Sequence, residues 1–226
     1  MLRKIGIALL FYGSCVCAMD QVESANAVAV KCSRDLKVIS YDVPRRYERI
    51  VKDIDGADIR NGWGLKIWDN VEGVLSELIA SGVSKSIRYL DIKYGMTSSV
   101  FRKLTDFNCL EYLILKKCFL GSSDLSLVPP CVKFLDLSEC LPLSGKLDTL
   151  NLSLLRSNDQ LQFLSLAGVT LGQKDVADLS LLKSLKYLDL SYSNFTAAIY
   201  KMRFPDTKLN IIDDREAADV YGGDVS

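Results

Sequence analysis

The sequence predicts an α/β solenoid, an arc of stacked coils with a parallel β-sheet on its concave side and helical or irregular segments on its convex side. Three observations support this prediction. A short apolar pattern recurs along the chain, its copies start at near-constant intervals, and each copy has the alternation of a strand. The length of 226 residues is enough for one domain with a sizeable core.

Five segments share one arrangement in which the first, fourth and sixth positions are apolar. They begin at Ile87, Leu110, Val132, Leu161 and Leu185, so successive starts are 23, 22, 29 and 24 residues apart. Side chains alternate along a strand, so the apolar positions should point into each coil and the residues between them outward. One coil cannot bury its own ends. We therefore expect the coils to stack and their strands to form a parallel sheet.

A further position completes the pattern. Three residues after the sixth position come Cys118, Cys140, Val169 and Ser193, and an apolar residue follows two positions later in several copies. The whole pattern resembles the leucine-rich-repeat family, whose consensus is L-x-x-L-x-L-x-x-N/C-x-L. The resemblance implies a leucine-rich-repeat arc and a role in binding, but it does not fix the partner. Small secreted members in bacteria or parasites engage host proteins, so it implies a protein partner, with a host protein as one kind.

The first eighteen residues have the pattern of a secretion signal. Arg3 and Lys4 precede an apolar run over 5–18, and Val16-Cys17-Ala18 offers small residues for cleavage. This run of 14 residues is shorter than the span of roughly 20 that a bilayer requires. We therefore expect a secreted protein, with residues 1–18 removed and no membrane span in the mature chain. The alternative is an intracellular adaptor or inhibitor in the cytoplasm, with an uncleaved N-terminus.

The remaining chain divides into three regions: an N-terminal cap over 19–53, the repeats over 54–208, and a C-terminal cap strand with a frayed tail over 209–226. Residues 36–41 are expected to form a capping strand, and residues 54–59 a degenerate first copy of the repeat. The stretch from Asp69 to Ile79 predicts a convex helix, with Asp69 and Glu72 as a capping box and Gly82 as its stop. We interpret residues 141–160 as a longer convex excursion.

Stacking would turn each outward repeat position into a column on the concave face. Position three is aromatic in all five copies, position five is mostly Asp, and position seven includes two lysines. Aromatic side chains beside charges favour protein recognition. Strand preference and local packing are the alternative explanation. The predicted partner-binding residues are Tyr89, Asp91, Lys93, Tyr112, Lys116, Phe134, Asp136, Phe163, Tyr187 and Asp189.

Composition argues against several other functions. Histidine is absent, which removes the commonest general base and a main zinc ligand, and we expect neither catalysis nor a cofactor nor a metal. Lys+Arg and Asp+Glu both number 28, so no strong field favours nucleic acid. Stacking would place Cys109 beside Cys131 and Cys118 beside Cys140, within reach of a disulfide. We favour thiols for Cys118 and Cys140, while the sequence leaves both states open for the other pair.

Overall fold

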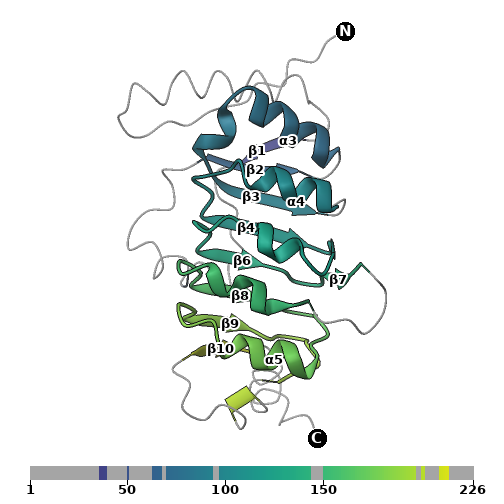
Figure 1. Cartoon of the computed structure of the whole chain (residues 1–226), viewed down its shortest axis with the longest axis vertical. Helices are drawn as coiled ribbons and strands as arrows, with labels where there is room; N and C mark the ends of the chain where they lie inside the picture. Colours follow the sequence, from purple (N-terminus) through teal and green to yellow (C-terminus); the bar gives the residue numbers. More distant parts are fainter. Residues whose placement is uncertain are drawn as a thin grey trace, which may run out of the picture.

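The structure is a computed structural model, and it describes residues 36–39, 50, 63–67, 70–93, 97–143, 150–196, 200–201 and 209–213. Within these residues the fold is mixed α/β with a mostly parallel sheet. The larger sheet has eight strands in the order β1-β2-β3-β4-β6-β8-β9-β10, which is also their order in the chain. Figure 1 shows these strands following one another along the long axis of the molecule.

The strands of the larger sheet are parallel from β2 to β10, and only β1 runs antiparallel to its neighbour. The five predicted copies of the repeat form β3, β4, β6, β8 and β9, and the predicted C-terminal cap strand forms β10. The bounds are β1 Leu36–Ile39, β2 Trp63–Ile67, β3 Ile87–Lys93, β4 Tyr112–Lys116, β6 Phe134–Asp136, β8 Phe163–Ser165, β9 Tyr187–Asp189 and β10 Asn210–Ile212.

Short helices connect the strands and lie on one face of the sheet (Figure 1). A second, two-stranded parallel sheet joins β5 to β7 beside this layer. The connecting elements are α3 Val71–Ala80, η3 Val83–Ser86, α4 Ser98–Leu104, β5 Phe119–Leu120, η4 Asp124–Leu127, β7 Leu141–Pro142, η5 Leu152–Ser157 and α5 Gln173–Leu179. We call the sheet face that these helices cover the helical face.

Helix α3 confirms the predicted helix but not its predicted start. The residue before the helix is Asn70, which has a left-handed backbone (φ 44°) and makes no side-chain cap hydrogen bond. Asp69, the first member of the predicted capping box, lies outside the described residues. The end is as predicted, because the chain leaves the helix through Gly82 at a φ of 75°, which glycine adopts without a steric cost.

The N-terminal part of the sheet contains one strand that the sequence predicted, β1, and one that it did not, β2. The capping strand near residue 36 is β1, and it pairs with β2. The strand beside β3 is β2, Trp63–Ile67, which the sequence analysis did not identify. The degenerate copy predicted at residues 54–59 lies outside the described residues. Lys66 therefore takes the place beside Asp91 in the column of fifth positions.

Two hydrophobic clusters lie on the two faces of the sheet. The larger one fills the space between the helical face and the connecting segments, and it includes Leu90 and Leu113 from strands with Leu75 and Phe101 from helices. These side chains alternate along each strand with the residues of the second cluster. The second cluster consists of Ile50, Tyr89, Tyr112, Ile114, Phe134 and Phe163, with Tyr187 and Ile212 packed against it.

Candidate functional site

The sheet face opposite the helices carries the predicted aromatic column, and we call it the aromatic face. Strand pairing places Tyr112 beside Tyr89, Phe134 beside Tyr112, Phe163 beside Phe134 and Tyr187 beside Phe163. Ring centroids are 6.5 Å apart for Tyr89–Tyr112, 5.7 Å for Tyr112–Phe134 and 4.0 Å for Phe134–Phe163. The last pair is nearly parallel, at 9°. From Tyr89 to Phe163 the predicted column is therefore a continuous ladder of aromatic contacts.

The ladder is not the exposed surface that the sequence analysis expected. Tyr89, Tyr112, Phe134 and Phe163 are buried, and only Tyr187 is partly exposed. Ile50, which precedes the repeats in the chain, belongs to the cluster that these rings form. An aromatic ring contacts a partner directly only where its surface is accessible. In this conformation the rings therefore act as a second core.

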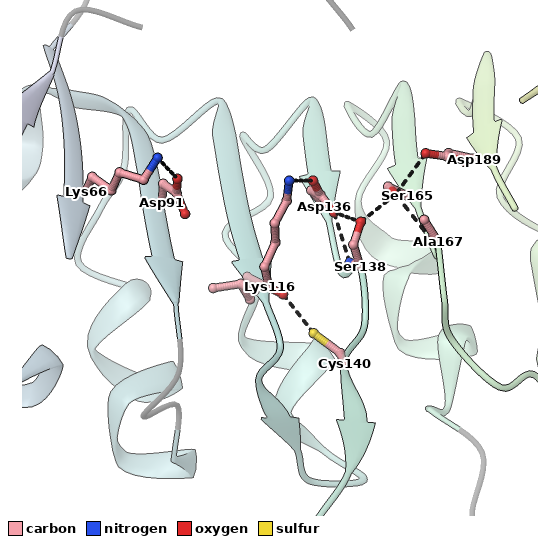
Figure 2. Close-up of polar contacts among 10 residues, drawn as sticks. Lys66, Asp91, Lys116, Asp136, Ser138, Cys140, Ser165, Ala167 and Asp189 are labelled. Atoms are coloured by element: carbon pink, nitrogen blue, oxygen red, sulfur yellow. Dashed lines mark hydrogen bonds and ion pairs between the residues drawn. The ribbon is translucent and has the colours of Figure 1, made fainter. Parts of the chain in front are cut away.

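A chain of hydrogen bonds runs beside the ladder, across β6, β8 and β9. The Ser138 hydroxyl donates to Asp136 Oδ1, and it lies 2.9 Å from the Ser165 hydroxyl. The Ser165 hydroxyl in turn lies 3.3 Å from Asp189 Oδ2. Figure 2 shows these side chains pointing toward one another from neighbouring coils. All four residues are buried, and these contacts give Asp136 Oδ1 and Asp189 Oδ2 partners within the protein.

Asp136 and Asp189, the two acids in this series of hydrogen bonds, also accept hydrogen bonds from the backbone that follows their strands. The Ser138 backbone N–H donates to Asp136 Oδ1 at 2.9 Å, and the Ser191 backbone N–H donates to Asp189 Oδ1 at 2.9 Å. In the coil between them the backbone N–H of Ala167 points to the Ser165 hydroxyl at 3.4 Å (Figure 2). On these three strands the fifth-position side chain thus accepts a bond from the residue two places later. This is a local structural role that the sequence analysis did not assign.

Two lysines each form an ion pair with an aspartate on the next strand of the sheet. Lys66 Nζ lies 3.0 Å from Asp91 Oδ2, and Lys116 Nζ lies 3.3 Å from Asp136 Oδ2. Figure 2 shows both lysines reaching one coil onward. Ile114 occupies the fifth position on β4 and is buried in the aromatic cluster, which separates these two ion pairs. Asp91 and Asp136 are therefore buried, paired carboxylates separated by Ile114, and the column is not a continuous negative strip.

The predicted binding residues fall into two groups. The following seven are buried: Tyr89, Asp91, Tyr112, Phe134, Asp136, Phe163 and Asp189. Three are partly exposed, namely Lys93, Lys116 and Tyr187. The structure brings the ten residues together on one face, as predicted, but most of them have no accessible surface. The expectation that they form an open binding face was wrong for the buried seven.

The sequence analysis missed an apolar patch that is exposed. Phe119 on β5 pairs with Leu141 on β7, and Leu143 directly follows β7, where its backbone N–H donates to the Leu120 carbonyl at 2.8 Å. Their exposed fractions are 53%, 50% and 60%. The signal was present at the tenth repeat position, directly after Cys118 and Cys140, where the later copies carry Thr170 and Asn194. We call Phe119, Leu141 and Leu143 the apolar patch.

The buried cysteines behave as core residues. Cys118 and Cys140 follow β4 and β6, and the Cys140 thiol donates to the Leu115 carbonyl at 2.7 Å (Figure 2). The hydrogen bond to Cys118 and burial together raise the pKa of the Cys140 thiol well above its ordinary value. A thiol held in this way is a poor nucleophile. All four described cysteines, Cys109, Cys118, Cys131 and Cys140, are free thiols in the structure.

Among the described residues no group of three or more His, Cys, Asp or Glu side chains is placed to hold a metal ion. The Ser138 hydroxyl is bonded to a carboxylate in a buried site and has no histidine beside it, because the sequence contains none. Within the same residues no helix has the length and apolar character needed to cross a membrane.

Comparison with known proteins adds little. No protein-family model matches the sequence, and no curated protein sequence is similar to it. A solved structure of a Bacteroides fragilis protein is similar over 88% of this chain and 84% of that chain, with 11% sequence identity and a TM-score of 0.34. A likeness of this size carries no argument about fold family or function.

Proposed function

We propose that this chain is an exported leucine-rich-repeat recognition protein that binds a protein partner. Two features support the repeat assignment. The five pattern segments are neighbouring parallel strands whose equivalent residues pair, as with Tyr112 and Phe134. The ninth-position residues Cys118, Cys140, Val169 and Ser193 are buried, as are Leu120 and Leu171 at the eleventh position, which fits that repeat. The signal-like N-terminus supports export.

The apolar patch is the observation that carries the binding assignment. Most large apolar side chains of the described residues are buried, yet these three gather on β5, β7 and the residue after it. A contiguous exposed apolar patch marks an interaction site more often than scattered single residues do. The partner is therefore inferred to bury an apolar surface against Phe119, Leu141 and Leu143. This location replaces the aromatic face as the primary contact.

An affinity capture with three baits tests the proposal. The parent is compared with a Phe119→Ser, Leu141→Ser, Leu143→Ser variant and with a Leu181→Ser, Tyr192→Ser control. Leu181 and Tyr192 are also exposed apolar residues, but they lie outside the patch. A protein held by the parent and the control, and lost by the patch variant, supports the proposal. A protein held equally by all three places the site elsewhere, and no captured protein in candidate host and same-cell extracts contradicts a recognition function.

A further inference from the structure

Two cysteines occupy the same position in two stacked turns. The Leu110 backbone N–H donates to the Phe107 carbonyl at 3.1 Å, and the Val132 N–H donates to the Pro129 carbonyl at 3.1 Å. Each bond closes a four-residue turn of the type in which the first carbonyl accepts from the fourth N–H. Cys109 is the third residue of one turn and Cys131 is the third residue of the other. Their equivalence follows from the repeat.

The sheet register brings these two turns side by side. The turns lead directly into β4 and β6, where Tyr112 pairs with Phe134. The pairing extends to the residues just before these strands, because the Lys133 N–H donates to the Glu111 carbonyl at 2.9 Å. Neighbouring strands lie about 4.8 Å apart. Cα atoms at equivalent turn positions therefore fall within the roughly 4.4–6.8 Å that a disulfide spans.

The Cys131 sulfur already lies against the turn that carries Cys109. Its thiol points at the Phe107 carbonyl oxygen, with a distance of 3.8 Å. Burial raises the pKa of the Cys131 thiol, the backbone N–H of Leu110 lowers it, and the nearby charge of Cys109 raises it. Phe107 and Leu110 are the first and last residues of the Cys109 turn. The two sulfurs thus belong to one small region, and Cys109 is exposed to solvent there.

We propose that Cys109 and Cys131 are a modification site, at which exchange with a low-molecular-weight disulfide such as glutathione disulfide forms a crosslink between adjacent coils. The exposed Cys109 thiolate attacks one glutathione sulfur, the S–S bond of glutathione disulfide breaks, and one glutathione thiolate leaves. The Cys131 thiolate then attacks the Cys109 sulfur and releases the second glutathione. The cysteine pair loses two electrons, glutathione disulfide gains them, and the two cysteine protons end on the two glutathione thiols.

The buried pair provides an internal comparison. Cys118 and Cys140 are also one repeat apart, but both are buried, and the Cys140 thiol is engaged with the Leu115 carbonyl. A disulfide reagent must reach a sulfur to react with it. Exchange is therefore expected at the turn pair and not at the core pair. This inference is independent of the proposed partner binding.

The test uses the full chain in a glutathione redox buffer, followed by acid quenching, alkylation and peptide mapping. The expected product is a Cys109–Cys131 crosslinked peptide, with Cys118 and Cys140 still open to alkylation after unfolding. The Cys131→Ser variant should instead accumulate a glutathionyl adduct on Cys109, because the second exchange step is missing. Separate adducts on both cysteines of the parent, or a crosslink from either of them to another cysteine, would overturn the proposal.

A stability measurement gives an independent readout. The crosslink constrains the unfolded chain, so the oxidised parent should unfold at a higher urea concentration than the reduced parent. The Cys109→Ser variant should unfold at the same concentration in both buffers, and its exposed site makes loss of folding an unexpected outcome. A redox-dependent shift of equal size in the parent and in the Cys109→Ser variant would contradict the assignment of the crosslink to this pair.

Discussion

Lys116 Nζ on β4 lies 3.3 Å from Asp136 Oδ2 on β6, where the Asp136 side chain is fully buried. The other carboxylate oxygen accepts from the backbone and the hydroxyl of Ser138. A buried carboxylate is tolerated only when a counter-charge and hydrogen bonds replace its water. Lys116 and Asp136, which the sequence suggested as part of a binding column, therefore join two neighbouring strands of the sheet.

The first prediction concerns Asp136. An Asp136→Ala variant should lose about 3 kcal/mol of unfolding free energy, because Lys116 and Ser138 lose their shared acceptor. The matched control is Glu139→Gln, which breaks the exposed pair in which Lys117 Nζ lies 3.2 Å from Glu139 Oε2. That change should cost less than about 1 kcal/mol. Urea denaturation measures both values, and similar losses in the two variants would refute the structural role of Asp136.

The second prediction concerns the aromatic ladder. Phe134 is buried and stacks on Phe163 at a centroid distance of 4.0 Å, so Phe134→Ala should leave a cavity and cost about 3–5 kcal/mol. Tyr192→Ala is the control, since Tyr192 is 67% exposed. Thermal or urea unfolding provides the comparison. If Phe134→Ala unfolds like the control, the ladder is open to solvent and the original surface interpretation regains support.

Ladder burial also determines how binding experiments are interpreted. A variant that combines Tyr112→Ala, Phe134→Ala and Asp136→Ala removes buried groups, so lost binding would reflect lost folding. Substitutions at Phe119, Leu141 and Leu143 avoid this problem, because these side chains are exposed. For the proposed partner site, the patch variant is therefore the more specific test.

The repeat could be predicted from the sequence because its information is local. The first, fourth and sixth positions of each copy alternate correctly for a strand, and the spacing sets which residues pair across strands. Strand β2 was missed for a specific reason. Trp63 pairs with Ile87, but a register shift follows, and Leu65 and Ile67 then pair with Leu90 and Ile92. Trp63 and Leu65 are two residues apart, whereas Ile87 and Leu90 are three residues apart. The segment that forms β2 therefore does not match the repeat pattern.

Burial of the aromatic face could not be predicted in the same way. Tyr112 and Phe134 are buried in a cluster that also includes Ile50, a residue from outside the repeats. No periodicity links Ile50 to the strands that it contacts. The apolar patch was accessible to sequence reasoning, because Phe119 and Leu141 stand at a position where other copies are polar. Its exposure depends on the three-dimensional placement of β5 and β7.

The third prediction concerns pH. Burial raises the pKa of Asp175 in α5 above its ordinary value of 3.8, the Gly172 N–H lowers it, and the charge of Asp178 raises it further. The folded state therefore binds this proton more tightly than the unfolded chain, so Asp175 should lower stability as pH rises through the folded pKa. Asp175→Asn keeps an oxygen for the Gly172 N–H, whose present distance to the carboxylate is 3.0 Å.

Urea unfolding from about pH 3 to about pH 7 tests this contribution. The Asp175→Asn variant should gain stability relative to the parent as pH rises, because it removes the cost of charging a buried acid. Asp159→Asn serves as the control for the same chemical change at an exposed site. A stability difference between Asp175→Asn and the parent that is constant with pH would contradict the assigned direction of the shift.

The fourth prediction concerns Asn158, which joins two stacked turns. Its buried side-chain amide donates to the Val132 carbonyl at 3.1 Å and to the Pro129 carbonyl at 3.4 Å. Its oxygen accepts from the Gln160 N–H at 3.1 Å. Asn158→Ala should cost about 2 kcal/mol, because buried carbonyls lose their donor. Asn158→Asp should cost more, because a carboxylate oxygen would face two carbonyl oxygens.

Asn108→Asp is the matched control for the two Asn158 variants. Asn108 is exposed, and it lies in the turn from Phe107 to Leu110. It should change stability by no more than about 0.5 kcal/mol. The order of stability expected in urea is parent and Asn108→Asp first, then Asn158→Ala, then Asn158→Asp. Because Asp differs from Asn mainly by replacing a donor with a charged acceptor, an Asn158→Asp variant as stable as the parent would mean that the amide does not hold these coils together.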